Sequence, residues 1–205
     1  VKINGFDVLK QPEEAKKCVG YLPELPPLYM DMTVKEYLDF VAELKKLEKS
    51  LRAGYVKEAM KITKTEEVSG RLIRNLSKGY RQRVGFAQAV LGYPEILILD
   101  EPTVGLDPKQ IIEIRDLIKE LGKKHTIILS SHILSEISAV CDHVFIISHG
   151  KLVASDSTEN LLERMTGAQE IELLVKAEED TAETAIREVA QVERCEKTES
   201  KEDGA

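Results

Sequence analysis

The sequence predicts an α/β fold with a parallel sheet as its core, a helical insertion in its first half and a small α+β appendage at its C-terminal end. Three observations lead to this prediction. After residue 95, short apolar runs alternate with helical patterns, as in parallel sheets that are buried on both faces. A helix start signal opens the insertion. Hydrophobic residues make up 42% of the 205 residues, which is enough to bury such a core.

Strand patterns begin the chain. Val1–Leu9 is predicted to form a strand with a turn at Gly5, and a second strand is predicted over Cys18–Pro23. The second strand ends at Pro23, because proline has no N–H group to donate to a strand ladder.

A helical insertion is predicted over residues 32–93. Thr33 and Glu36 have the spacing of a capping box, in which each side chain accepts a hydrogen bond from the other residue's backbone N–H. Two helices follow, the second ending near Ile62, and we expect a plain helical hairpin. Their buried faces are predicted to be Val34, Tyr37, Leu38, Val41 and Leu44 in the first helix and Leu51, Tyr55, Ala59 and Met60 in the second.

After the insertion, three strands covered on both faces are predicted at Ile96–Leu99, Thr126–Leu129 and Val144–Ile147. Asp107-Pro108 has the residue types of an N-cap and a first helical position, so a helix begins there, and Gly122 is expected to end it. The buried stripe of this helix is predicted to be Ile111, Ile114, Ile118 and Leu121, and a further helix is predicted over Ile133–Cys141.

The last part of the chain is predicted to be a separate unit. His149-Gly150 forms a turn into a strand over Lys151–Ala154, and a short helix follows from Ser157. We place the main domain at residues 1–165 and the appendage at residues 166–205. The appendage is predicted to contain a strand from Ile171 and a helix over Ala182–Val189. Whether these elements make a complete unit stays open.

Charge and cysteine content exclude some classes of protein. The formal net charge is −7, but ten acidic and four basic residues between Glu178 and Asp203 account for most of it. The rest of the chain is nearly neutral, so we expect no nucleic-acid partner. No run approaches 18 apolar residues, and no membrane span is predicted. The cysteines lack a C-x-x-C pattern and are predicted to be reduced thiols: Cys18, Cys141 and Cys195.

The first motif with chemical meaning is Asn75–Arg83. Ser77 is a natural N-cap, and Gly79 lets backbone N–H groups approach a phosphate at the positive end of a helix dipole. A cap without any ligand is the plainer interpretation of a serine at this place. Arg81 and Arg83 are predicted to be ion-pair partners on the helix surface.

The second motif is an apolar strand that ends in Asp100 and Glu101. Open α/β sheets bind ligands at the carboxyl ends of their strands. We predict that the strand terminates at Pro102, which lets both carboxylates approach one site. Asp107 follows this motif, and His132 follows the next predicted strand. The other histidines have no metal-ligand spacing with one another: His125, His143 and His149.

Together and in this order, the two motifs resemble those of the ATP-binding cassette (ABC) ATPases, over about residues 1–165. The resemblance implies a P-loop-NTPase-like sheet core that uses ATP and Mg²⁺. Asp100 would help to hold Mg²⁺, mainly through water, and Glu101 would be the general base. His132 would contact the γ-phosphate and orient the attacking water.

The same resemblance implies a second ATPase subunit. In this family the helix-start motif reaches the γ-phosphate of ATP that the partner subunit holds. Ser77, Lys78 and Gly79 are therefore expected to bind nucleotide in a head-to-tail dimer. Asp107 matches the loop that communicates across this dimer, although it could be the helix cap alone.

The sequence departs from the family pattern at three positions. Lys78 and Tyr80 stand where glycine and glutamine are frequent, and both variants are familiar in members that serve exporters. Glu24 follows Tyr21-Leu22-Pro23, where most members have a glutamine that senses Mg²⁺ and water. A carboxylate there could bind Mg²⁺ more strongly but would repel the γ-phosphate. Altered metal preference or slower turnover is therefore our hypothesis.

One component of the family is missing from this sequence. It contains no G-x-x-x-x-G-K-[ST] phosphate loop, and the abrupt start at Val1 predicts a truncation before that loop. The lysine and N–H groups of the loop make charge-assisted contacts worth about 1.5–3 kcal/mol each. We therefore expect the 205-residue chain alone neither to bind ATP tightly nor to hydrolyse it.

A narrower resemblance is to the ATPase subunits of ABC-2 type exporters, particularly the gliding-motility-associated group. It implies an ATPase on the cytoplasmic face of the bacterial inner membrane, where Glu24 and the insertion couple hydrolysis to export through a separate transmembrane permease subunit. Two other interpretations stay open: a non-catalytic ABC-like interaction protein, and a soluble ABC-type ATPase that is not engaged in transport. The latter normally has two cassettes or a long coiled coil, and neither occurs in this sequence.

Overall fold

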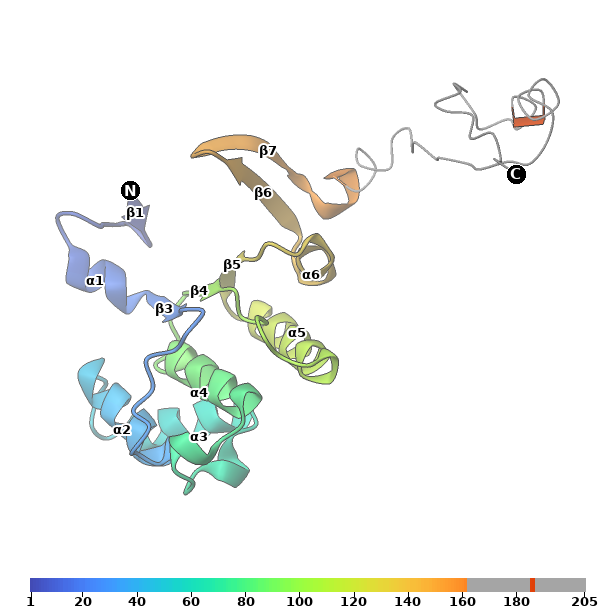
Figure 1. Ribbon diagram of the computed structural model, residues 1–205. Helices are drawn as coiled ribbons and strands as arrows, with labels where there is room; N and C mark the ends of the chain where they lie inside the picture. The colour runs from blue at the N-terminus through green and yellow to red at the C-terminus, as the bar shows by residue number, and fades with distance from the viewer. Residues whose placement is uncertain (162–184, 187–205) are drawn as a thin grey trace, which may run out of the picture. The chain divides into compact units, whose positions relative to one another are not determined.

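The computed structural model describes residues 1–161 and 185–186 (Figure 1). The chain divides into two compact units, Val1–Ser155 and Asp156–Ala205, and the first contains every candidate site residue. The helices are α1 (Pro12–Lys17), α2 (Val34–Leu44), α3 (Arg52–Ile62), the 3₁₀ turns η1 (Glu66–Val68) and η2 (Ile73–Asn75), α4 (Lys78–Val90), α5 (Pro108–Gly122) and α6 (Leu134–Val140). The strands are β1 (Lys2–Ile3), β2 (Phe6–Asp7), β3 (Val19–Leu22), β4 (Ile96–Asp100), β5 (Thr126–Ser130), β6 (His143–Ser148) and β7 (Lys151–Ser157).

The predicted parallel sheet is confirmed, in the order β3-β4-β5. Val19 pairs with Ile96, and Ile96 pairs with Thr126, so the three strands begin level with one another. The helical insertion connects β3 to β4, and α5 connects β4 to β5. The carboxyl ends of all three strands therefore lie at one edge of the sheet.

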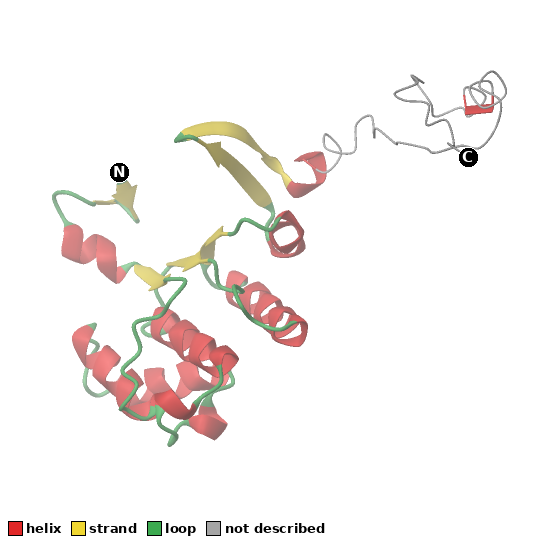
Figure 2. Cartoon of the chain, viewed as in Figure 1, coloured by secondary structure: helices red, strands yellow, loops and turns green. Residues whose placement is uncertain are grey.

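One face of this sheet is covered and the other is open. Leu97 and Leu99 are fully buried, and α4 and α5 lie on their side of the sheet (Figure 2). On the opposite face, Ile98 borders an apolar cavity of about 580 Å³ and Ile128 is 55% exposed. Within residues 1–161, the prediction that these strands are covered on both faces is therefore wrong.

The third predicted strand belongs to another sheet. β6 pairs with β7 in a two-stranded sheet, and the turn between them contains His149 and Gly150, both with positive φ. Phe145 and Ile147 of β6 are 64% and 69% exposed. The apolar run predicted the strand correctly, but the prediction that it lies covered in a parallel sheet is wrong for the described residues.

The helical insertion contributes most of the buried core. The predicted capping box is present: Thr33 Oγ1 accepts a hydrogen bond from the N–H of Glu36 at 3.3 Å, and the Glu36 carboxylate accepts one from the N–H of Thr33 at 2.8 Å. Two residues predicted to be buried, Leu44 and Leu51, are exposed, because they stand at the last position of α2 and before the first position of α3. Val56 is buried in α3 together with the predicted Ala59 and Met60, whereas Tyr55 is only partly buried.

The C-terminal end of α4 is held tightly against β3 and α2. A Cβ atom on Gly20 of β3 would lie 2.2 Å from the carbonyl oxygen of Ala89, so only glycine permits this approach. From the end of α2, the ammonium of Lys45 donates hydrogen bonds to the carbonyl oxygens of Gln88 and Leu91 at 3.0 and 2.8 Å. These bonds satisfy carbonyl groups that a helix end leaves without partners.

α5 begins as predicted and ends differently. The Asp107 carboxylate accepts a hydrogen bond from the N–H of Gln110 at 2.9 Å, and Pro108 is the first helical residue. Gly122 is the last helical residue and is followed by Lys123 in the right-handed α conformation, so it is not the left-handed stop that was expected. The buried residues of α5 are Ile114, Leu117, Ile118 and Leu121, whereas Ile111 is only half-buried.

Several sequence predictions concern the end of the chain. Residues 158–161 are helical, as predicted, while the strand predicted from Ile171 lies outside the described residues. The helix predicted over Ala182–Val189 also lies outside them, apart from residues 185–186, which are helical. Cys18 and Cys141 are free thiols. No helix in the described part of the chain is both long and apolar enough to cross a membrane.

Candidate functional site

The central strand β4 delivers Asp100 to the carboxyl edge of the sheet. The hydroxyl of Ser130, the residue paired with it on β5, donates a hydrogen bond to one carboxylate oxygen of Asp100. The Tyr21 hydroxyl on β3 lies 3.5 Å from the other oxygen. One residue from each neighbouring strand therefore orients this carboxylate.

Glu101 leaves the strand through an unusual backbone conformation. Its φ is 46°, in the left-handed region that non-glycine residues rarely adopt, so β4 ends at Asp100. The prediction that the strand terminates at Pro102 is therefore wrong by one residue, because the chain already turns at Glu101. Such strain often marks functional sites. The turn at Glu101 places the carboxylates of Asp100 and Glu101 at the same edge of the sheet.

The Glu101 carboxylate has two distinct oxygens. Oε1 lies 2.8 Å from Nδ1 of His132, which follows β5. Oε2 is buried and has no hydrogen-bond partner among the described residues. The Glu101 side chain is only 20% exposed, whereas the His132 ring is 70% exposed. One oxygen is thus fixed by the histidine, and the other remains available as an acceptor.

The contact with Glu101 also favours the protonated form of His132. The hydrogen bond, and after it the negative charge of Glu101, raise the pKa of His132 above its usual value. The more distant charges of Glu136 and Glu24 act in the same direction. The imidazole is therefore protonated over a wider pH range than a free histidine.

The predicted Mg²⁺ residues were Asp100 and Glu24. The described residues contain no cluster of three or more histidine, cysteine, aspartate or glutamate side chains suited to a metal. Glu24 is exposed and makes no hydrogen bond or ion pair with any described residue. A single carboxylate, Asp100, fits a Mg²⁺ ion that takes its other ligands from water and phosphate oxygens, which is the usual arrangement for this ion.

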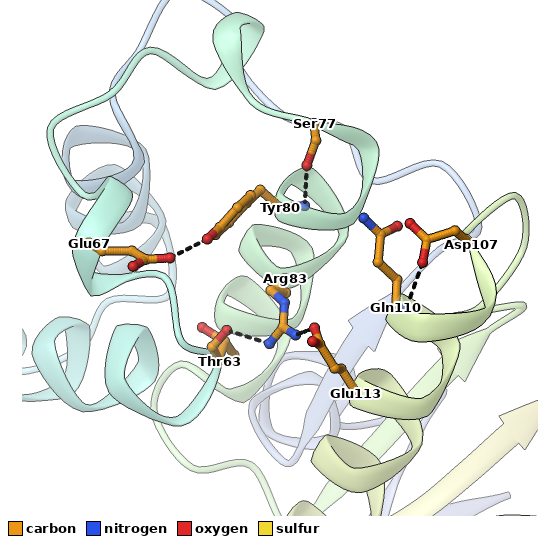
Figure 3. Close-up of polar contacts among 8 residues, drawn as sticks. All are labelled: Thr63, Glu67, Ser77, Tyr80, Arg83, Asp107, Gln110 and Glu113. Carbon is orange, nitrogen blue, oxygen red and sulfur yellow. Dashed lines mark hydrogen bonds and ion pairs between the residues drawn. The ribbon is translucent and has the colours of Figure 1, made fainter.

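The helix-start motif forms a second cluster (Figure 3). Ser77 is the N-cap of α4, and its hydroxyl accepts a hydrogen bond from the N–H of Tyr80 at 3.4 Å. The predicted cap is therefore confirmed. The Tyr80 hydroxyl donates to Glu67, in the turn η1 (Figure 3).

Packing against α5, as well as access for a phosphate, explains why glycine stands at position 79. Gly79 is buried, and a Cβ atom there would lie 2.7 Å from the side-chain amide of Gln110 on α5. The ammonium of Lys78 lies against Gly105, where a Cβ atom would be 1.9 Å from it. Asp107 caps α5 through Gln110, so the starts of α4 and α5 meet at this glutamine (Figure 3).

The two arginines of the motif match the prediction only in part, because within residues 1–161 Arg83 alone forms an ion pair. Arg83 is buried rather than on the helix surface: it pairs with Glu113 at 2.6 Å and donates to the carbonyl oxygen of Thr63 at 3.2 Å (Figure 3). Arg81 makes no ion pair among the described residues and donates instead to the carbonyl oxygen of Leu76 at 3.0 Å. Each arginine thus donates a hydrogen bond to a backbone carbonyl oxygen of the insertion, Arg83 to Thr63 and Arg81 to Leu76.

The structure thus brings the predicted residues together in two groups. Asp100, Glu101 and His132 lie at the sheet edge, and no hydrogen bond or ion pair within residues 1–161 joins them to the second group, Ser77, Lys78, Gly79 and Asp107. The sequence analysis missed Tyr21, Ser130, Gln110 and Glu136, which support these groups. Ser130 was the easiest to find, since it directly follows the predicted strand Thr126–Leu129.

A parallel sheet with adjacent carboxylates at its carboxyl edge, together with a glycine-containing helix start, defines a class of ATP-binding α/β proteins. Comparison with known proteins supports this classification. The family model described as ABC transporter matches residues 1–104. The chain belongs to the ABC transporter family.

Three relatives illustrate the similarity. The bacitracin transport ATP-binding protein BcrA of Bacillus licheniformis is 39% identical over 166 residues, which are 80% of this chain and 53% of that protein. The ABC transporter ATP-binding protein NatA of Bacillus subtilis is 34% identical over 80% of this chain and 67% of its own length. The linearmycin resistance ATP-binding protein LnrL of Bacillus subtilis is 31% identical over 94% of this chain and 62% of that protein.

Solved structures agree with the fold. The structure of cbiO1 from Clostridium perfringens, part of the ABC transporter complex cbiONQ, has a TM-score of 0.68 and 29% identity, over 74% of this chain and 62% of that chain. An ATP-binding subunit of an ABC transporter has the same TM-score and identity over 82% of this chain and 71% of its own. The chain spans about half the length of the first curated relatives that it matches.

Proposed function

We propose that the complete protein is a nucleotide-binding subunit of an ABC transporter that hydrolyses ATP. The observation that carries this proposal is the Glu101 carboxylate. Its Oε1 is held by His132, and its buried Oε2 has no partner among the described residues. A buried acceptor at the carboxyl edge of the sheet suits a general base that takes a proton from an attacking water.

His132 has two functions in this proposal. Through Nδ1 it fixes the Glu101 carboxylate, and its exposed ring is free to reach a phosphate. The raised pKa of His132 favours the imidazolium, which attracts phosphate oxygens. Asp100 would hold Mg²⁺ mainly through water, and this ion would neutralise phosphate charge when bound.

The separation of the two clusters supports a dimer. Ser77, Lys78 and Gly79 lie at the start of α4, where N–H groups and the ammonium of Lys78 suit a γ-phosphate. No hydrogen bond or ion pair within residues 1–161 joins them to Glu101. We propose that they complete the site of a second subunit in a head-to-tail arrangement, with Asp107 at the contact between the subunits.

The partner in the membrane would dock between β3 and the helical insertion. Leu25 and Tyr29 are 78% and 50% exposed in the loop that carries Glu24. The ring of Tyr29 rests on Phe40 of α2, with their centroids 5.2 Å apart, so this apolar surface is fixed to the insertion. It suits a transmembrane permease subunit at the cytoplasmic face of the bacterial inner membrane.

Export is the direction we propose, through a permease of the ABC-2 type. Relatives named for bacitracin transport and linearmycin resistance support transport as the function. We also propose that residues 1–165 belong to the ATPase domain and residues 166–205 to an appendage. Because the sequence lacks a phosphate loop, we propose that the 205-residue chain alone is inactive.

The decisive experiment uses the complete protein with its permease. Glu101→Gln keeps the shape of the side chain and removes the base, so kcat for ATP should fall by about 10²–10⁴-fold while ATP still binds. Glu120→Gln, an exposed carboxylate on α5, is the matched control and should leave kcat unchanged. Unaltered turnover in Glu101→Gln would show that another group is the base.

A further inference from the structure

The helix after His132 is anchored by a carboxylate. Glu136 is the only buried residue of α6, although this helix also contains the apolar residues Leu134, Ile137 and Val140. A buried carboxylate costs free energy unless it has partners. The most buried position of such a short helix would be expected to hold an apolar side chain, so Glu136 needs an explanation.

Both oxygens of Glu136 have partners on other elements. The hydroxyl of Thr103 donates a hydrogen bond to Oε2, and the guanidinium of Arg115 on α5 lies 3.9 Å from Oε1. Thr103 is itself buried, at 6% exposure. Arg115 Nε is buried without a hydrogen-bond partner among the described residues, and the ion pair with Glu136 is the one polar side-chain contact of Arg115 within them.

These contacts join the same two segments that Glu101 and His132 join. Thr103 stands two residues after Glu101, and Glu136 stands four residues after His132. Two side-chain contacts therefore join residues 101–103 to residues 132–136: Glu101 with His132, and Thr103 with Glu136. The second contact is buried, whereas the His132 ring is 70% exposed and has little packing of its own.

We propose that Glu136 is a positioning residue, which holds the His132 loop against Glu101 through its contact with Thr103. In the loop between β5 and α6, the N–H of Ile133 donates a hydrogen bond to the Ser131 hydroxyl, and α6 has no side-chain N-cap. Without Glu136, the part of α6 nearest to His132 loses its side-chain contact with Thr103, while Val140 at the other end of the helix still packs against the core. The effect on hydrolysis rests on the proposed function, but the effect on the Glu101–His132 contact does not.

The contact can be followed by NMR titration of the His132 imidazole in the full chain. Thr103→Val removes the hydroxyl, keeps the shape and changes no charge, so it separates positioning from the direct charge effect of Glu136. The titration midpoint of His132 is raised by Glu101 and should fall in Thr103→Val. Val140→Ala is the control, because it trims a residue of α6 that packs against the core and takes no part in the Thr103–Glu136 hydrogen bond.

The proposal is overturned if Thr103→Val leaves the His132 midpoint unchanged, or if Val140→Ala lowers it as much at equal loss of thermal stability. In the complete protein, Glu136→Ala should lower kcat for ATP about tenfold with little change in KM, because a displaced group costs rate more than binding. Glu136→Gln still accepts from Thr103 and should recover part of this loss. A midpoint that falls in Thr103→Val while the complete wild-type protein shows no ATPase activity would refute the proposed function and leave the positioning role intact.

Discussion

The guanidinium of Arg83 on α4 lies 2.6 Å from the carboxylate of Glu113 on α5 and 3.2 Å from the carbonyl oxygen of Thr63 at the end of α3. This one side chain joins the helical insertion to the helix that Asp107 caps. α4 and α5 thus contact each other at two points. Near their starts, Gly79 packs against Gln110, and further along the two helices Arg83 pairs with Glu113. The two helix starts should therefore move as one body.

Arg83→Met should lower the free energy of unfolding by about 2–3 kcal/mol, because it leaves a carboxylate and a carbonyl group without their shared partner. Urea denaturation followed by circular dichroism measures this loss. Lys123→Ala breaks the exposed ion pair with Glu120 and is the control, with an expected loss below about 1 kcal/mol. Equal losses in the two variants would mean that Arg83 is not the connection described.

Gly20→Ala should destabilise the protein by about 3 kcal/mol or more, since its Cβ atom would lie 2.2 Å from the Ala89 carbonyl oxygen. Neither backbone can yield without separating α4 from β3. Gly54→Ala in α3 meets nothing within 4 Å and should raise the free energy of unfolding by about 0.5–1 kcal/mol, because alanine favours the helix. Thermal melts of both variants test the contrast, and a stable Gly20→Ala protein would contradict the close approach.

Burial lowers the pKa of Lys45 from 10.5 to about 8. Between these two values the unfolded chain binds more protons at this position than the folded chain does, so this group makes the free energy of unfolding rise with pH from about 8 to 10.5. Lys45→Met removes that dependence. Urea unfolding of both proteins across this window should favour the wild type increasingly as the pH rises, and a constant difference would contradict the burial of the ammonium.

Glu24→Gln in the complete protein tests the most unusual residue of the predicted site. The carboxylate of Glu24 is exposed and lies near enough to His132 for its charge to raise the pKa of the imidazole. Removing this charge should increase kcat for ATP, because a negative group no longer opposes the γ-phosphate, and should change the Mg²⁺ concentration needed for half-maximal rate. Turnover and Mg²⁺ dependence that both stay the same would remove Glu24 from the site.

Much of the fold was predictable because local chemistry decides it. The capping box at Thr33, the Asp107-Pro108 helix start and the apolar run of β4 each contain their own signal, and the structure has all three. The fate of β6 was not predictable. Its apolar run indicates a strand, but an apolar run does not specify which strand lies beside it.

The candidate site was predictable in its residue types and less so in its geometry. Asp100 and Glu101 were found because a strand ends there, yet the left-handed turn at Glu101 is set by tertiary contacts. Gln110 and Glu136 lie within helices whose patterns indicate only a surface and a buried face. Their partners are 31 and 33 residues away in sequence, at Gly79 and Thr103, and spacing alone contains no information about such contacts.

The pairing of β3 with β4 also determines how the protein must be made. Val19 pairs with Ile96, and the helical insertion is synthesised between them. At about 5–20 residues per second, the partner of Val19 leaves the ribosome roughly 4–15 s after it. During that interval the insertion can form its local helices, while β3 stays an apolar strand with unpaired N–H and carbonyl groups. A nascent chain halted between residues 23 and 95 therefore presents β3 as an unpaired strand with which another chain can pair.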